Sequence, residues 1–458
     1  MAIKLSGLGA QNPWWRGGHW EEEDVDLKDI DVLLNRKKIE IKKGEVYLFR
    51  GIRRAGKTVY IKSIIKELIG KIDGRKILYL SCDRYHRGET KNTIKEFIKR
   101  SHGEVVILDE ITYLDDWHLI LKELAETTDL TILATGSNPL KIKEKGERLP
   151  GRKIEGNEYF IGPLSFRDFL SNLINLNGKI KNPDIFNAVR KIKKFKSFQP
   201  TSPDINEEVP YFDEIDSLFY SYLLTGGFPS VINEYLKNGR IDERSYEMIV
   251  RMFLGALSKE GKNEEIGREL MERMLSLGTS RTDFHTIGSD IGVHHNTVKE
   301  YVELLENSRM IYLLPAWDLS RKRYAPRKQK KFIFQSSFLS SSLYVYLTGG
   351  KYEDALDFLD KNLESIIEQT ASSHLIWAYE KPLIRERHSF AGFYYDKKEC
   401  DFLLHENMKW HGFEVKYGKV EREKYPFPVF YLTKDTFSED SYPVSLFLAG
   451  LEKSEKSI

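Results

Sequence analysis

The chain has few cysteines and no long apolar segment. Its 458 residues include only Cys82 and Cys400, too few for a disulfide framework, which favours a reducing compartment. No apolar run approaches the roughly 20 residues of a membrane-spanning helix. The first residues also lack the charged-then-apolar order of a secretory signal. These absences predict a soluble cytoplasmic protein with no membrane partner.

A strong excess of one charge is also missing. The formal net charge is +2 although 31% of the residues are charged, so any charged binding surface must be local. The hydrophobic content of 41% is sufficient for packed cores. At about 150 residues per domain, the length predicts three or four domains.

The most informative stretch is Gly51–Thr58, which matches the phosphate-binding pattern G-x-x-x-x-G-K-[ST] at every fixed position. Residues 46–49 predict a buried strand before it, and residues 59–68 have helical spacing after it. Lys57 is expected to contact the β- and γ-phosphates, and the Thr58 hydroxyl to ligate Mg²⁺. The predicted nucleotide-binding residues are Gly51, Arg53, Arg54, Ala55, Gly56, Lys57, Thr58 and Val59.

Strand and helix patterns alternate through residues 31–160, which predicts an α/β domain with a parallel sheet. The apolar strand at 105–108 ends in Asp109 and Glu110. Asp109 is expected to hold Mg²⁺, and Glu110 to orient and deprotonate the attacking water.

Three further polar residues follow in this region. A strand at 130–135 leads into Ser137 and Asn138, which either contact the γ-phosphate or the lytic water or form an ordinary turn. Arg152 is expected on an exposed loop, either as a surface residue or as a stabiliser of transition-state charge in its own or a neighbouring subunit.

These motifs together resemble the archaeal and bacterial AAA+ ATPases of the AAA_14 type. The resemblance implies an AAA+ fold, hydrolysis of ATP with Mg²⁺, and an arginine-finger role for Arg152. That role implies a ring or other homo-oligomer. The family commonly carries a C-terminal DUF4143 domain. The resemblance rests on Arg50–Thr58, Leu108–Ile111 with Trp117, Thr135–Asn138, Gly151-Arg152 and Gly162–Phe169.

Two segments flank this domain. Residues 1–30 contain Trp14, Trp15 and Trp20, which either pack against the ATPase domain or form a stacking platform for a base or nucleotide. Residues 161–245 are rich in helix patterns and predict a helical lid. A sharp helix–helix break is expected at Thr225–Pro229.

Residues 246–333 predict a winged helix. A helix starting at His294 is expected to bury Val298, Tyr301, Val302 and Leu305, which leaves its N-terminal residues for base edges. Residues 321–331 contain seven basic residues in eleven, as a phosphate backbone would require. A protein contact and a merely solvated loop are the alternatives. The predicted DNA-binding residues are His295, Asn296, Lys299, Arg321, Lys322, Arg323, Arg327 and Lys328.

Residues 340–458 predict a mixed α/β domain. Asp401 and Glu414 are separated by enough residues for one hairpin and are expected to face each other, with Lys416 on the face of Glu414. Two carboxylates and a lysine suit Mg²⁺-assisted attack on a phosphodiester, and Glu368 on the preceding helix is a further possible ligand. This pattern resembles PD-(D/E)xK nucleases and DUF4143, in which Glu399 also belongs to the pattern.

The predicted fold class is therefore α/β, with a P-loop AAA+ parallel sheet, a helical lid, a winged helix and a restriction-endonuclease-like C-terminal domain. The expected function is ATP hydrolysis coupled to DNA binding or remodelling. Two alternatives are an ATP-dependent switch acting on a protein partner and an ATP-regulated, metal-dependent nuclease. In the nuclease-like domain, acid–lysine pairs also occur as plain salt bridges, and the fold can serve binding without cutting.

Overall fold

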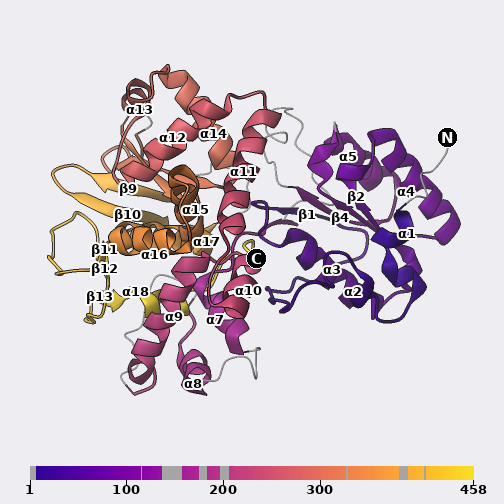
Figure 1. The fold of residues 1–458 in the computed structure, drawn as a ribbon, viewed down its shortest axis with the longest axis horizontal. Helices are drawn as coiled ribbons and strands as arrows, with labels where there is room; N and C mark the ends of the chain where they lie inside the picture. Colours follow the sequence, from indigo (N-terminus) through magenta and orange to yellow (C-terminus); the bar gives the residue numbers. More distant parts are fainter. Residues whose placement is uncertain are drawn as a thin grey trace. The chain divides into compact units, whose positions relative to one another are not determined.

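The computed structural model divides into two compact units, residues 1–162 with Ile458, and residues 163–457 (Figure 1). The predicted lid, winged helix and nuclease-like segments share the second unit from residue 163 onward. Four predicted site residues, Ser137, Asn138, Arg152 and Arg327, lie outside the described residues. The structure describes residues 7–114, 116–136, 157–174, 183–195, 206–325, 328–380, 390–406 and 409–458.

The first unit contains a five-stranded parallel sheet in the order β2-β3-β4-β1-β5. The parallel α/β arrangement is the one that the alternating pattern predicts. The strands are β1 (Val46–Arg50), β2 (Ile77–Ser81), β3 (Val105–Asp109), β4 (Thr131–Gly136) and β5 (Glu158–Phe160). The helices are α1 (Leu8–Gln11), α2 (Trp20–Glu23), α3 (Lys57–Ile69), α4 (Arg87–Ser101) and α5 (Trp117–Thr127).

Alternation along the strands separates two apolar faces. Even-numbered strand residues such as Leu48 and Leu108 pack with Trp117 of α5 and Ile94 of α4 in one core. Odd-numbered residues point to the opposite face, where the Phe49 ring meets α3. Figure 1 shows α3 and α5 on opposite sides of the strands. Asp109 is odd-numbered and therefore faces α3, the helix that follows the phosphate loop.

β2 forms one edge of this sheet, and side chains of the N-terminal segment bind its backbone. The Asn12 amide donates to the Tyr79 carbonyl at 3.0 Å, and its oxygen accepts from the Tyr79 N–H at 2.7 Å. The Gln11 oxygen accepts from the Ser81 N–H at 2.9 Å. These bonds occupy groups that another chain could otherwise pair with.

The tryptophans of this segment pack against the sheet. Trp14 and Trp20 are buried and meet edge to face, with ring centroids 5.3 Å apart. The indole N–H groups of Trp14 and Trp15 both donate to the Ile77 carbonyl, and the Trp15 ring stacks on Phe97. The packing interpretation is confirmed. The stacking-platform interpretation is wrong for Trp14 and Trp20, because their faces are already covered.

The second unit begins with helices and continues into a mixed sheet. The expected break between the first long helices occurs at Gly226 and Gly227, which both have positive φ. Before the sheet the helices are α7 (Phe166–Ile174), α8 (Pro183–Lys191), α9 (Phe212–Thr225), α10 (Pro229–Asn238), α11 (Glu243–Lys259), α12 (Glu264–Leu277), α13 (Phe284–Asp290) and α14 (His295–Asn307). Further helices are α15 (Ser337–Thr348), α16 (Tyr352–Lys361), α17 (Leu363–Tyr379) and α18 (Val444–Gly450).

The mixed sheet has eight strands and runs β13-β12-β11-β10-β9-β6-β7, with β8 paired to β6. β6 pairs with β8 through residues 311–315, and the two strands form an antiparallel hairpin. β6 also pairs with β9 through residues 316–317, so this strand joins the β6–β8 hairpin to the C-terminal strands. The strands are β6 (Ile311–Asp318), β7 (Arg323–Tyr324), β8 (Lys330–Phe334), β9 (Ala391–Tyr395), β10 (Glu399–Glu406), β11 (Lys409–Lys416), β12 (Val429–Thr433) and β13 (Ser441–Pro443).

The helix predicted to start at His294 begins at His295, with the His294 side chain accepting from the Asn296 N–H. Its four predicted core residues are all buried. Within the described residues, no helix is both long and apolar enough to cross a bilayer.

Candidate functional site: the phosphate loop and its carboxylates

The loop between β1 and α3 adopts a tight turn around the Lys57 side chain. The Lys57 Nζ donates to the carbonyls of Gly51 and Ile52 at 3.1 and 3.2 Å, and lies 3.6 Å from the Glu110 Oε1. Burial lowers the pKa of the Lys57 ammonium, and the charges of Glu110 and Asp109 oppose that shift. A buried cation therefore faces the carboxylates at the end of β3.

Two glycines of this loop are required by its geometry. Gly56 has φ +85°, a left-handed conformation that residues with a side chain rarely adopt. A Cβ on Gly51 would lie 1.8 Å from the Ile161 carbonyl oxygen. The neighbouring backbone therefore requires a glycine at position 51, and a bound anion would add a second reason for glycine there.

Asp109 is the centre of a hydrogen-bonded group of side chains. Its Oδ2 accepts from the Thr58 hydroxyl at 2.8 Å and from the Tyr79 hydroxyl at 2.7 Å. Its Oδ1 accepts from the Thr135 hydroxyl. The structure therefore brings together Thr58 and Asp109, the two residues predicted to ligate Mg²⁺.

Glu110 follows in a left-handed conformation, with φ +51°. Its N–H donates to the Thr135 hydroxyl at 2.8 Å. Residues in this strained region are kept there by surrounding contacts and occur most often at functional sites. Here the turn directs Glu110 toward Lys57 at the loop.

Among the other loop residues, the Arg53 guanidinium donates to the Tyr113 hydroxyl at 2.8 Å and lies over the Tyr113 ring. Arg54 is exposed and has φ +65°. The Ala55 carbonyl accepts from Arg36. Sequence reasoning assigned no role to Arg36 or Tyr113.

Tyr79 and Thr135 are the partners of Asp109 that sequence reasoning missed. Both have odd numbers on their strands, as does Asp109, so all three lie on the face covered by α3. Burial and the charge of Asp109 raise the pKa of Tyr79 well above its ordinary value, which keeps its hydroxyl a donor. The odd residue numbers shared by Tyr79, Asp109 and Thr135 could have indicated that their side chains lie on one face of the sheet.

A buried ion pair lies behind Tyr79. The Lys62 Nζ donates to the Asp24 carboxylate at 2.7 Å, and both side chains are 1% exposed. The same ammonium lies 4.0 Å from the centre of the Tyr79 ring and 5.1 Å from that of Trp14. This pair connects the N-terminal segment to α3.

The predicted DNA-binding residues occupy two places in the second unit. Asn296 and Lys299 are exposed near the start of α14, and His295 is half-buried against His285 and His294. Arg321, Lys322, Arg323 and Lys328 are exposed around β7. Lys331, the last residue of the basic run, lies within strand β8 and is buried. The prediction that the whole run forms an exposed basic surface is therefore wrong for Lys331.

The predicted nuclease residues are also close in space. The β10–β11 register pairs Phe402 with Phe413, so Asp401 and Glu414 are the next positions along it. Lys416 Nζ lies 2.6 Å from the Glu414 Oε2. Within the described ranges, however, no group of three or more acidic, histidine or cysteine side chains is arranged to hold a metal ion.

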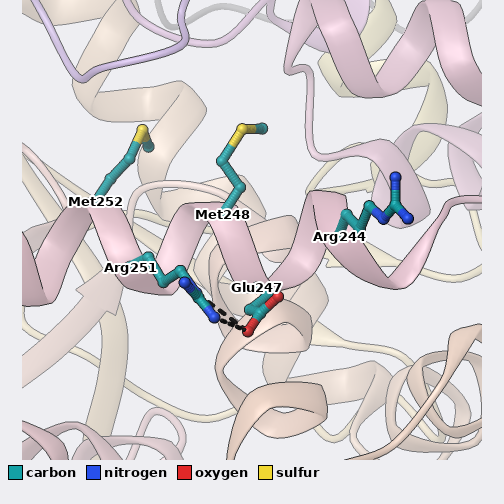
Figure 2. Close-up of a pocket in the computed structure, with 5 residues that line it drawn as sticks. All are labelled: Arg244, Glu247, Met248, Arg251 and Met252. Atoms are coloured by element: carbon teal, nitrogen blue, oxygen red, sulfur yellow. Dashed lines mark hydrogen bonds and ion pairs between the residues drawn. The ribbon is translucent and has the colours of Figure 1, made fainter.

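A hollow of about 470 Å³ lies along α11. Figure 2 shows that Met248 and Met252 project from one side of the helix, and that Glu247 and Arg251 form an ion pair on the other side. Arg244 completes the lining. These residues supply no convergent polar groups, so we assign no chemistry to this hollow.

Comparison with known proteins agrees with the geometry of the first unit. Residues 43–170 match the AAA_14 family model, described as an AAA domain. Residues 216–349 match DUF8612, a domain of unknown function. This range covers most of the predicted lid and winged helix, whereas DUF4143 was expected over residues 340–458, so the match gives that expectation no support.

Two curated relatives also match. An uncharacterized protein of Methanocaldococcus jannaschii is 24% identical over 319 residues, which cover 67% of this chain and 64% of that protein. An uncharacterized protein of Haemophilus influenzae is 24% identical over 300 residues, which cover 63% of this chain and 66% of that protein. The matches thus span about two thirds of each relative.

Proposed function

We propose that this protein binds MgATP at Gly51–Thr58 and hydrolyses it. The observation that carries the proposal is the contact between the Thr58 hydroxyl and Asp109, 2.8 Å apart, at the start of the helix that follows the loop. A hydroxyl and a carboxylate are oxygen ligands of the kind that Mg²⁺ accepts, so these residues fit the ion. The AAA-domain match over residues 43–170 supports the same activity.

Each residue then has a distinct part. Lys57 binds the β- and γ-phosphates, and the N–H groups of the loop face the same oxygens. Thr58 and Asp109 would hold Mg²⁺, which would supply positive charge to offset the negative charge of the phosphates. Glu110 orients the attacking water and accepts its proton. Arg152, with Ser137 and Asn138, completes the set, and Arg152 acts across a subunit interface of a homo-oligomer.

The test separates binding from hydrolysis. Lys57→Ala should abolish binding of a fluorescent ATP analogue. Glu110→Gln should retain binding and lower kcat by about 10²- to 10⁴-fold, the usual contribution of a general base. Lys71→Ala, at an exposed lysine just after α3, is the matched control. Equal ATP affinity in Lys57→Ala and the control would refute the proposal.

We also propose that α12–α14 with the β6–β8 hairpin form a winged helix that contacts DNA. The order of these elements and the bridge between Thr282 and Lys330 support the assignment. The exposed start of α14 and the exposed basic residues around β7 supply polar groups for base edges and cations for phosphates.

The salt dependence of DNA binding tests this second role. Each lost phosphate contact should lower the slope of log K against log salt by about one. Arg323→Ala should therefore weaken binding and reduce the slope, whereas Lys419→Ala, at an exposed lysine after β11, should change neither. Binding that is insensitive to salt in the wild type would contradict the DNA role.

Two alternatives remain from the sequence. In the first, a slow ATPase acts as a switch on a protein partner; ATPase rates with and without DNA distinguish it, since only a DNA-coupled enzyme is stimulated. In the second, the C-terminal segment is an ATP-regulated nuclease, but no metal-holding group of acidic, histidine or cysteine side chains among the described residues supports it. Sedimentation with and without ATP tests the homo-oligomer.

A further inference from the structure

Three carboxylates of the nuclease-like segment converge on one lysine. The Lys331 Nζ lies 2.9 Å from the Glu368 Oε1, 2.7 Å from the Glu399 Oε1 and 3.3 Å from the Asp401 Oδ1. The Lys331 side chain is 1% exposed. An ammonium has three N–H donors, so each carboxylate takes one of them.

The second oxygen of each carboxylate also has a protein donor. The Thr279 hydroxyl donates to the Glu368 Oε2 at 2.7 Å. Arg281 donates to the Glu399 Oε2.

The Val415 N–H donates to the Asp401 Oδ2 at 3.0 Å. All the oxygens of the three carboxylates are therefore bound within the protein.

The neighbouring acid–lysine pair is satisfied in the same way. Glu414 accepts from the Tyr425 hydroxyl at 2.5 Å through Oε1, and its Oε2 pairs with Lys416. No carboxylate of this described group keeps an oxygen that lacks a protein contact.

A divalent cation at this place would need to displace Lys331. Calcium and magnesium lie about 2.0–2.6 Å from their oxygen ligands, so an ion and the ammonium cannot share the three carboxylates. Burial disfavours the charged lysine, but the nearby carboxylates outweigh that effect and raise the pKa of Lys331 above its ordinary value. The ammonium thus stays charged. The residues present do not fit a bound metal.

We propose that Lys331 takes the place of the divalent cation, and that this cluster is a clamp and not a nuclease centre. Its side-chain donors, on Thr279, Arg281 and Lys331, come from the proposed winged helix. Its acceptors come from α17 and β10. The Arg281 guanidinium also stacks on Tyr395 of β9, 3.3 Å from the ring centre, which adds a second contact across the same boundary. The clamp therefore holds the proposed winged helix against the C-terminal strands.

The wild-type protein provides the first test, without nucleotide and therefore independently of the proposed ATPase. Labelled linear and branched DNA is incubated with Mn²⁺ and either the wild type or Asp401→Asn, and Mn²⁺ uptake is measured in parallel. The clamp predicts no DNA cleavage and the same number of bound Mn²⁺ ions for both proteins. Cleavage that disappears in Asp401→Asn, or one fewer bound Mn²⁺ in that variant, would overturn the proposal.

A variant provides the second test. Lys331→Met keeps the length of the side chain and removes its charge, while Lys330→Met is the control at the adjacent lysine, which donates instead to the Lys328 carbonyl. Lys331→Met should bind one more Mn²⁺ than the wild type and melt at a higher temperature when Mn²⁺ is added. A folded Lys331→Met without additional Mn²⁺ binding would refute the substitution of lysine for metal. If Lys331→Met does not fold, the comparison of DNA cleavage and Mn²⁺ uptake between the wild type and Asp401→Asn still tests the proposal.

Discussion

The buried pair between Lys62 and Asp24 gives the sharpest prediction for stability. Lys62→Met keeps the side-chain volume but leaves the Asp24 carboxylate, 1% exposed, without its cation. Removing one member of a buried ion pair costs about 3–5 kcal/mol, because the remaining charge is buried without compensation. The lysine also lies over the Tyr79 and Trp14 rings, which adds contacts that methionine retains only in part.

A nearby surface pair provides the control. Lys66 pairs with Glu21 at 2.8 Å, on the same two segments, but its side chain is 65% exposed. Lys66→Met should therefore cost at most about 1 kcal/mol. The double variant Lys62→Met/Asp24→Leu should recover most of the loss, since apolar replacement of a whole buried pair is often neutral.

The assay follows urea unfolding of the full chain by tryptophan fluorescence, together with hydrogen exchange of residues 7–24. Two compact units need not unfold in one step, so the exchange data identify the transition that belongs to the first unit. We expect exchange in the N-terminal segment to accelerate in Lys62→Met alone. Equal costs for Lys62→Met and Lys66→Met would refute the argument from burial.

Three other predictions test particular contacts. Tyr79→Phe removes a hydrogen bond to Asp109 and should weaken Mg²⁺-dependent ATP binding about 10- to 100-fold, as the loss of a group that supports a metal ligand does. The Tyr60 hydroxyl donates instead to the Lys37 carbonyl, so Tyr60→Phe should leave ATP binding unchanged. Gly51→Ala should cost about 1–3 kcal/mol in urea unfolding, because its Cβ meets the Ile161 carbonyl, while Gly70→Ala has only ordinary contacts and should be tolerated. Burial and then the charge of Asp401 raise the pKa of Glu368 from 4.5 to about 7, so the folded state holds this proton more tightly. Relative to Glu368→Gln, the stability of the wild type should be highest below pH 4.5 and fall as the pH rises through about 7; a parallel pH dependence in the two proteins would contradict this.

The first unit could largely be predicted from the sequence because its signals are local. The spacing of Gly51, Lys57 and Thr58 identified the turn between β1 and α3, and the apolar strand before Asp109 identified β3. Tyr79 was missed because its contact with Asp109 depends on which strands lie near each other, and chain order does not specify that.

The second unit shows where charge patterns mislead. Lys331 belongs to a run of basic residues, which predicted an exposed loop. The apolar residues that follow it, Phe332–Phe334, extend the strand, and the fold brings Glu368 and Asp401 to its ammonium. A lysine beside an apolar strand was the available clue, but its three acceptors come from residues 37–70 positions further along the chain.

Strand β6 has a mechanical consequence for the second unit. Residues 311–315 pair with β8 and residues 316–317 with β9, so the β6–β8 hairpin and the C-terminal strands share one strand. A slip of one residue would turn every side chain of the strand to the opposite face, which excludes sliding as a way to move one part against the other. A fragment that ends after Phe334 would expose the β9-facing edge of β6, so expression of the fragment should yield aggregates in place of an isolated module.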